Sequence, residues 1–332
     1  MGQPAVDPSC QWITYTATLP ATDADPHPQS RVYRFRFNGG TTDAVSAPTG
    51  EAAGNPSISY DGRYIAFEQG GGVHVRDLDT GALEQAGAEG ASAPSLSGDG
   101  RRVAFRQGNE IHVRDLDAGT TTRVRGTEPS LSGSGTHLAY TSRDAVYLLE
   151  LATGQRQLVS VDRWGGRNDL PARHPSVNAD GTVVAFESAS PDLVEGTPTG
   201  CRTSSCGQFN DNDHQRGTTM HSTKRVVALA IALAAATATL SGTSAGAAPR
   251  APYTEKASVA PDGTDGNRGS NGQSLSADGR HLAFVSDADN LVAGDSNGVA
   301  DAFVRDLRTG VTRLASTAAD GSPGRRTSWT SR

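Results

Sequence analysis

The most constraining feature of this 332-residue chain is a pattern of residues that it repeats several times. Each full copy begins with Ser-x-Ser, continues with a Gly-containing turn and an apolar run, and ends at a second turn glycine. Four copies are recognisable, at residues 56–81, 94–119, 129–154 and 273–310. A fifth copy at 175–196 has only the first half of the pattern, and residues 31–40 match only the second half.

The spacing between the copies predicts an architecture. The prolines that open successive copies, Pro56, Pro94, Pro129 and Pro175, are 38, 35 and 46 residues apart. Repeats of this length with strand-like content are typical of propeller blades or of a similar array.

One copy contains the strands of one blade. In the copy at 56–81, PSIS is a short strand, YIAFE is an apolar strand suited to burial on both faces, and VHVRDL alternates. Asp61-Gly62 supplies the positive φ that a tight turn needs, and the residues after Gly81 form an outer strand. One blade cannot bury both of its faces alone, so neighbours must stack on it. We therefore expect an all-β fold, a β-propeller of about five to six four-stranded blade units, some of them incomplete.

These units resemble the PD40 (WD40-like) repeats of TolB-type β-propellers. The resemblance is carried by P-S-x-S-x-D-G-R-x-x-A-F and V-x-V-R-D-L-x-T-G, and it covers about 56–196 and 255–320. The Trp-Asp and Gly-His signature of true WD40 blades is absent from the sequence. The resemblance implies a secreted or periplasmic location and a scaffold for protein or ligand contacts, without fixing the partner.

Composition agrees with a turn-rich β protein. The chain has 39 glycines and 17 prolines, which predict many turns, and only 5% aromatic residues, so that Val, Leu, Ile and Ala must supply most of the core. The net charge of −6 argues against a generic nucleic-acid binder, because neutralising phosphates requires a basic surface.

A second feature interrupts the repeats in the middle of the chain. Met220 and the basic pair Lys224-Arg225 precede an apolar run of 15 residues at 226–240, and Ala245-Gly-Ala247 follows. A basic segment, an apolar segment and an A-x-A site together are typical of a secretory signal peptide. A membrane anchor and a buried helix are the alternatives, although the run is shorter than the roughly 20 residues that a span needs.

The repeats and this run together predict the domain organisation. Residues 10–217 form propeller blades with an incomplete last blade, 220–248 form a signal-peptide-like or membrane-anchor helix, and 255–332 form a blade and the start of a further one. In this interpretation an apolar, Ala-rich helical segment interrupts the propeller. Since a signal peptide at this position is out of place, we expect a junction of two truncated paralogous propeller genes.

The sequence offers one candidate disulfide and one candidate calcium site. Cys201 and Cys206 lie in the short polar loop CRTSSC and could form a local disulfide outside the cytoplasm. Asp295, Asn297 and Asp301 place oxygen side chains at positions 1, 3 and 7 of a loop, an arrangement that calcium accepts, and 211–213 could be a counterpart. The bidentate Glu of an EF-hand loop is missing, so the favoured alternative is a turn rich in Asp and Asn that needs no metal. No other cofactor is expected.

Three further patterns have simpler interpretations. GTSAG at 242–246 matches G-x-S-x-G, but it lies in the cleavage region rather than between a strand and a helix, which indicates a chance match. Arg-Asp pairs recur at 76–77, 114–115 and 305–306, and their equivalent positions indicate structural ion pairs or inter-blade hydrogen bonds rather than a ring of ligands. His74 and His112 also occupy equivalent positions and are interpreted as surface features, not metal ligands.

These features predict a non-enzymatic, exported scaffold that binds a protein or cell-envelope ligand through loops at one mouth of the propeller. One alternative is a propeller enzyme that acts on polysaccharide with residues at the central channel. Another is a membrane-anchored propeller with 226–240 as the span. Carboxylates and histidines converging on the channel would favour the enzyme, and an uncharged or Asx-lined channel would favour the binder. No nucleic-acid partner is expected, and contact with a membrane only if 226–240 is retained as an anchor.

Overall fold

The computed structural model describes residues 5–7, 11–19, 29–47, 51–162, 164–190, 193, 226–231 and 253–316. In these ranges the chain forms strands and turns and no helix. The strands make six four-stranded sheets, which we number 1 to 6 in chain order. In every sheet the four strands are consecutive in the sequence and each pairs antiparallel with the next.

The first three sheets have the following strands: β1 Ala5–Val6, β2 Trp12–Leu19, β3 Gln29–Arg36 and β4 Thr42–Ala44; β5 Ala53–Ile58, β6 Tyr64–Gln69, β7 Gly72–Asp77 and β8 Leu83–Gly87; β9 Ala91–Leu96, β10 Arg102–Gln107, β11 Glu110–Asp115 and β12 Thr121–Arg125. The last three have these: β13 Thr127–Leu131, β14 His137–Ser142, β15 Ala145–Glu150 and β16 Arg156–Leu158; β17 Ala172–Val177, β18 Val183–Ser188, β19 Val226–Ile231 and β20 Tyr253–Lys256; β21 Ser270–Leu275, β22 His281–Ser286, β23 Asp301–Asp306 and β24 Val311–Leu314.

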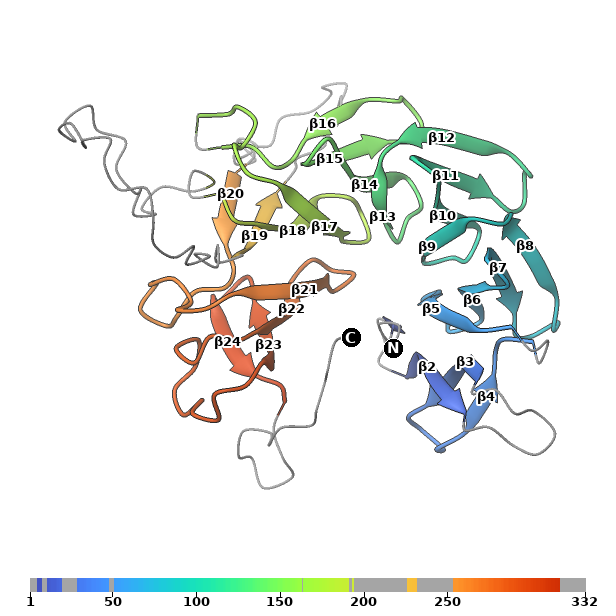
Figure 1. Cartoon of the computed structure of the whole chain (residues 1–332), viewed down its shortest axis with the longest axis horizontal. Helices are drawn as coiled ribbons and strands as arrows, with labels where there is room; N and C mark the ends of the chain where they lie inside the picture. The colour runs from blue at the N-terminus through green and yellow to red at the C-terminus, as the bar shows by residue number, and fades with distance from the viewer. Residues whose placement is uncertain are drawn as a thin grey trace, which may run out of the picture.

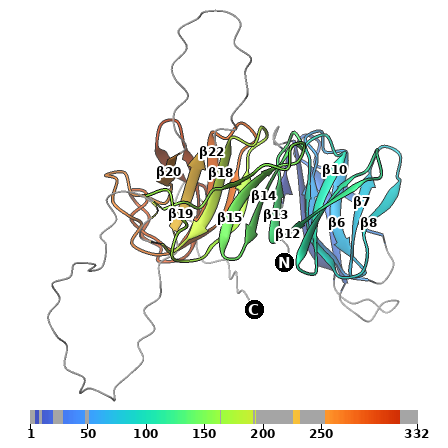
Figure 2. The same ribbon diagram turned by 90° about the horizontal axis from the view of Figure 1, so that it is seen from above.

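The sheets are arranged as a β-propeller. In Figure 1 they fan around a common axis, with the first strand of sheets 2 to 6 innermost and the later strands outside. Figure 2, which views the molecule from above, shows successive sheets lying side by side. The predicted all-β propeller architecture is therefore confirmed.

The turn predicted between the first two strands of each repeat is also present. The glycines at this point, Gly62, Gly100, Gly135, Gly181 and Gly279, have φ between 68° and 79°. This left-handed conformation strongly favours glycine because a Cβ atom would be strained there. The repeated Asp-Gly and Ser-Gly dipeptides are thus backbone requirements of the blade.

The hydrophobic core is divided among the gaps between sheets. Five clusters of buried apolar residues each combine two successive sheets, from sheets 1 and 2 to sheets 5 and 6. Between sheets 2 and 3, for example, Ala66 and Val75 of sheet 2 pack with Val103 and Phe105 of sheet 3. Because every internal sheet contributes one face to each of two clusters, the stacking predicted from the repeat accounts for the burial.

The helix predicted at 220–248 is wrong at 226–231, the part of it that the structure describes. Val226–Ile231 is strand β19. It pairs along its whole length with β18, and its residues 228–231 also pair with β20 on the other side. Residues 232–240 lie outside the described residues. A short apolar run has no periodicity that separates a buried strand from a buried helix. The free edge of β18 needs a partner for its backbone N–H and C=O groups, and the β-branched Val226, Val227 and Ile231 suit that position.

Sheet 5 consequently contains strands from both sides of the 194–225 stretch, since β17 and β18 precede it and β19 and β20 follow it. In the part of the chain that the structure describes, no helix has the length and apolarity to cross a membrane.

Candidate functional site

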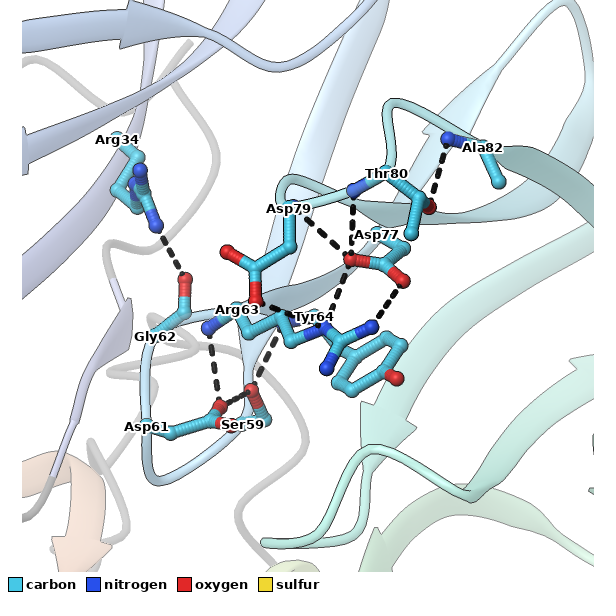
Figure 3. Close-up of polar contacts among 10 residues, drawn as sticks. All are labelled: Arg34, Ser59, Asp61, Gly62, Arg63, Tyr64, Asp77, Asp79, Thr80 and Ala82. Carbon is cyan, nitrogen blue, oxygen red and sulfur yellow. Dashed lines mark hydrogen bonds and ion pairs between the residues drawn. The ribbon is translucent and has the colours of Figure 1, made fainter.

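The repeated polar residues build the turns of each sheet, as Figure 3 shows for sheet 2. The Ser59 hydroxyl donates to Asp61 at 2.6 Å and accepts the backbone N–H of Tyr64 at 2.9 Å. Asp61 also accepts the N–H of Arg63 at 3.0 Å. The same Ser-Asp bond recurs at Ser97 and Ser276, so this motif holds the turn.

The Arg-Asp pairs have the structural role that the sequence predicted, but the two residues of a pair do not bond to each other. Asp77 forms a bidentate ion pair with Arg63, at 2.6 and 2.8 Å. Asp115 pairs with Arg102 at 3.1 Å, and Asp306 with Arg280 at 2.7 Å. The hydrogen bond from Arg63 lowers the pKa of Asp77, and that from Arg280 lowers the pKa of Asp306. These carboxylates therefore stay ionised and fasten the second strand to the turn after the third.

Neighbouring sheets are joined by a ladder of serine hydroxyls around the axis. The N–H of Leu96 in sheet 3 donates to the Ser57 hydroxyl in sheet 2 at 3.0 Å. The N–H of Leu131 donates in the same way to Ser95 at 2.8 Å. Equivalent bonds link Val177 to Ser130 and Leu275 to Ser176. The first Ser of the Pro-Ser-x-Ser motif, which directly follows the proline, thus links the inner strands of neighbouring sheets.

A cavity of about 870 Å³ lies on the axis. The last residues of the inner strands line it: Ile58, Leu96, Leu131, Val177 and Leu275. Tyr60 is also in the lining, and 39% of this residue is exposed. The cavity wall is therefore predominantly apolar, with one tyrosine at its rim.

The charged residues in this lining already have partners within the fold. Asp7 accepts the N–H of Trp12 at 2.6 Å. Asp278 accepts the Ser276 hydroxyl, which lowers the pKa of this carboxyl. His281, the third, lies 3.9 Å from Asp306. His281 also lies close enough to Asp278 for a favourable electrostatic interaction, which lowers the pKa of that carboxyl further.

A second group of residues, missed in the sequence, gathers toward the opposite ends of the inner strands. His174 on β17 lies 3.3 Å from Glu128 on β13 through Nε2 and 3.3 Å from Glu187 on β18 through Nδ1. We call these three residues the mouth cluster. About half of the His174 side chain is exposed, whereas only 6% of the Glu187 side chain is.

Both carboxylates of the mouth cluster also have a backbone role. Glu128 accepts the N–H of His174 at 2.8 Å, and Glu187 accepts the N–H of Gly272 in sheet 6 at 2.9 Å. Glu68 accepts the N–H of Ala93 at 2.6 Å in the same manner. The residue that donates the N–H has positive φ each time, at 51°, 65° and 53°, and lies at a bulge of the inner strand.

A signal for this cluster was available in the sequence. The bulge residue is the one that precedes the opening proline of a copy, and its side chain differs from copy to copy: Asn55, Ala93, Glu128 and His174. An alignment of the copies marks this position as the variable one at the axis.

Two of the three residues of the predicted calcium loop, Asn297 and Asp301, form hydrogen bonds within the fold. Asp301 accepts hydrogen bonds from the Asn297 side-chain amide at 2.7 Å and from the Ser316 hydroxyl at 2.5 Å, and Asn297 Oδ1 accepts the N–H of Val299. Asp295 is 8% exposed, its Oδ1 has no partner, and burial raises its pKa. No group of three or more His, Cys, Asp or Glu side chains suited to a metal ion occurs among the residues that the structure describes. A calcium ion at 295–301 stays a prediction.

The remaining predicted residues fall into two groups. His74 and His112 lie against the aromatic residues of the preceding strand, Phe67 and Phe105, with ring centroids 6.0 and 5.5 Å apart. Burial lowers the pKa of His74. Cys201, Cys206, the 211–213 segment and the GTSAG sequence lie outside the described residues.

Comparison with known proteins supports the fold. No family model matches the sequence, and no curated protein matches it. An oligogalacturonate lyase in complex with manganese is similar in structure, with a TM-score of 0.56 and 12% identity over 99% of this chain and 78% of that one. The β-propeller domain of the Trilobed protease from Pyrococcus furiosus has a TM-score of 0.53 and 11% identity, over 94% and 83% of the two chains.

A putative TolB from Agrobacterium tumefaciens is also similar, with a TM-score of 0.48 and 16% identity over 82% of this chain and 83% of that one. The β-propeller fold that the resemblance implies is confirmed by the similarity to the Trilobed protease propeller domain. At these identities the likeness shows the fold alone.

Proposed function

We propose that this chain is a propeller scaffold that binds a polypeptide or cell-envelope ligand at its axial cavity. The observation that carries the proposal is the cavity wall, which consists mainly of the apolar ends of the inner strands. An apolar concave wall with a few polar groups is typical of binding sites. The two carboxylates in the lining, Asp7 and Asp278, already accept hydrogen bonds within the fold, which favours binding over catalysis there.

The proposal can be tested by photo-crosslinking in the cell of origin. A benzophenone amino acid is placed at Tyr60, in the cavity, and in a control variant at Leu83, on the outer strand β8. The two residues are similarly exposed, at 39% and 42%. We expect a defined crosslinked species from position 60 and none from position 83. Equal labelling of both positions, or no adduct from either, would contradict the proposal.

A second candidate function, an enzyme acting on polysaccharide, is favoured by the mouth cluster. His174 between two carboxylates could move a proton, although both carboxylates also accept backbone N–H groups. Incubation with oligogalacturonides and other acidic oligosaccharides, followed by assay of new chain ends, tests this alternative. We expect no turnover, and turnover that disappears in a His174→Gln variant would establish the enzyme.

We also propose that the protein acts outside the cytoplasm. Support comes from the signal-peptide pattern at 220–247. Cleavage after Ala247 would separate β19 from β20. A molecule that has been cleaved there therefore no longer has sheet 5 within one continuous chain. The intact masses of the products in culture supernatant and cell extract test export and the gene-junction hypothesis together.

A further inference from the structure

The connection between the second and third strands of sheet 6 is longer than its counterparts. In sheets 2 to 4 two residues join these strands, as at 70–71 and 108–109. In sheet 6 the whole segment 287–300 lies between β22 and β23. Leu291 of this segment is fully buried, in the core cluster that also contains Phe303 of β23. The connection is therefore packed against the sheet and has a defined interior of its own.

This interior contains a carboxylate oxygen without a partner. Asp295 is 8% exposed, and its Oδ1 accepts no hydrogen bond from the residues that the structure describes. A buried carboxylate normally has a donor or a positive charge beside each oxygen, because the loss of water is otherwise uncompensated. Asp295 Oδ1 is thus a buried acceptor for which the described part of the fold supplies no donor.

The charges around Asp295 increase the need for a cation. Burial raises the pKa of Asp295, the negative charge of Asp301 raises it further, and Asp289 adds a smaller effect in the same direction. A hydrogen bond from the backbone N–H of Asn297 partly offsets these effects. Among the described residues, the charged groups that shift this pKa are therefore both negative. A bound cation would reverse the repulsion between these carboxylates.

The other two side chains of the predicted loop are fixed in place by hydrogen bonds. Asp301, the first residue of β23, is 3% exposed and accepts hydrogen bonds from Asn297 Nδ2 at 2.7 Å and from the Ser316 hydroxyl at 2.5 Å. An ionised carboxylate has about four lone-pair sites, so Asp301 retains capacity to accept. A turn rich in Asp and Asn accounts for these bonds of Asn297 and Asp301, but it does not account for the buried Oδ1 of Asp295.

We propose that Asp295, Asn297 and Asp301 bind a calcium ion within the β22–β23 connection. Calcium takes carboxylate, amide and backbone carbonyl oxygens in a flexible arrangement, so two carboxylates and one amide suffice as its side-chain ligands. Zinc and similar metals prefer His and Cys, which this set lacks. The ion would compensate the buried charge of Asp295 and fasten the connection to the start of β23. This inference goes beyond the proposed function and does not depend on it.

The experiment measures calcium binding by the whole chain after treatment with EGTA. Calcium chloride is titrated by calorimetry, and melting temperatures are compared in EGTA, in calcium and in magnesium. The test variant is Asp295→Asn, which keeps the shape of the side chain and removes its charge. The matched control is Asp262→Asn. Asp262 lies in an exposed turn, where its Oδ1 accepts the N–H and the hydroxyl of Thr264 at 3.0 and 2.6 Å.

We expect the original chain and Asp262→Asn to bind calcium with a Kd of about 1 mM or tighter, and calcium to raise their melting temperatures. Asp295→Asn should bind at least roughly tenfold more weakly, because the charge of the ligands sets the affinity. In EGTA it should melt at the same temperature as the original chain or higher, since an uncompensated buried charge has been removed. Absence of calcium binding by the original chain, or equal affinity of Asp295→Asn, would overturn the inference.

Hydrogen exchange read by mass spectrometry places the ion in the chain. Calcium should slow the exchange of the amides of 295–301 in the original chain and leave them unchanged in Asp295→Asn. Slower exchange confined to other segments would overturn the assignment to this connection. Equal protection of 295–301 by magnesium at the same concentration would overturn the assignment to calcium.

Discussion

At the scale of single residues, Tyr60 joins three sheets at the rim of the cavity. Its N–H donates to the carbonyl of Gly98 at 2.8 Å, and the N–H of Gly98 donates to the carbonyl of Gly133 at 2.8 Å. A Cβ atom on either glycine would overlap the Tyr60 ring. Both glycines are therefore required by the close approach of the Tyr60 side chain from sheet 2.

We expect Gly133→Ala to lower the free energy of unfolding by about 1–3 kcal/mol, because the new methyl group must displace the Tyr60 ring. Combining it with Tyr60→Ala should remove most of this additional cost. Gly54→Ala is the control, since its Cβ would meet Thr16 at an ordinary 3.7 Å. Urea denaturation measures all four proteins, and equal effects of Gly133→Ala and Gly54→Ala would refute the steric account.

Residues that serve the backbone could be predicted from the sequence, whereas the contacts that residues at the axis make with one another could not. Asp61-Gly62 was recognisable because a tight turn needs a positive φ and a side-chain acceptor, both of which are local. Glu128 and His174 meet through a bulge in one sheet and a bond to the next. This contact depends on how neighbouring sheets stack, and the sequence of a single repeat carries no information about that stacking.

At the scale of the element, sheets 2, 3 and 6 are each fastened by an ion pair between an arginine at or just before the start of the second strand and an aspartate at the end of the third. In sheet 2 the bidentate bond from Arg63 lowers the pKa of Asp77. A depressed carboxyl pKa stabilises the fold at pH values above the unfolded pKa, and the contribution is lost as pH falls toward the folded value. The protein should therefore lose stability below about pH 5.

We expect Asp77→Asn to cost about 1 kcal/mol or less at pH 7, where a partly exposed pair contributes little. It should also flatten the decline of the free energy of unfolding between about pH 5 and pH 2. Asp79→Asn is a matched control in the same turn, because Asp79 is more exposed and lies farther from Arg63, at 3.3 Å. Parallel pH profiles for Asp77→Asn and the original chain would show that this pair has no such role.

Strand β19 shows where local patterns stop being informative. The 226–240 run contains no turn signal and no polar alternation, so both a signal-peptide helix and a buried strand are compatible with it. The strand at 226–231 is selected by the open edge of β18, which lies about 40 residues earlier in the chain.

At the scale of the whole molecule, six sheets are held by five apolar interfaces and a ladder of serine bonds around the axis. The repeat predicted the stacking, because a blade with two apolar faces requires neighbours. It could not predict the closure of the ring, since closure depends on the faces of the first and last sheets, where Ala283 and Tyr15 depart from the burial of their counterparts.

The central claim of this account is that the repeats on both sides of residues 194–225 form one propeller, with β19 inside sheet 5. Hydrogen exchange of the intact chain, read by mass spectrometry, tests this claim most directly. The amides of 226–231 should exchange as slowly as those of 183–188 in β18, because both strands lie within one hydrogen-bonded sheet. Complete exchange of 226–231 within seconds, while 183–188 remain protected, would contradict it.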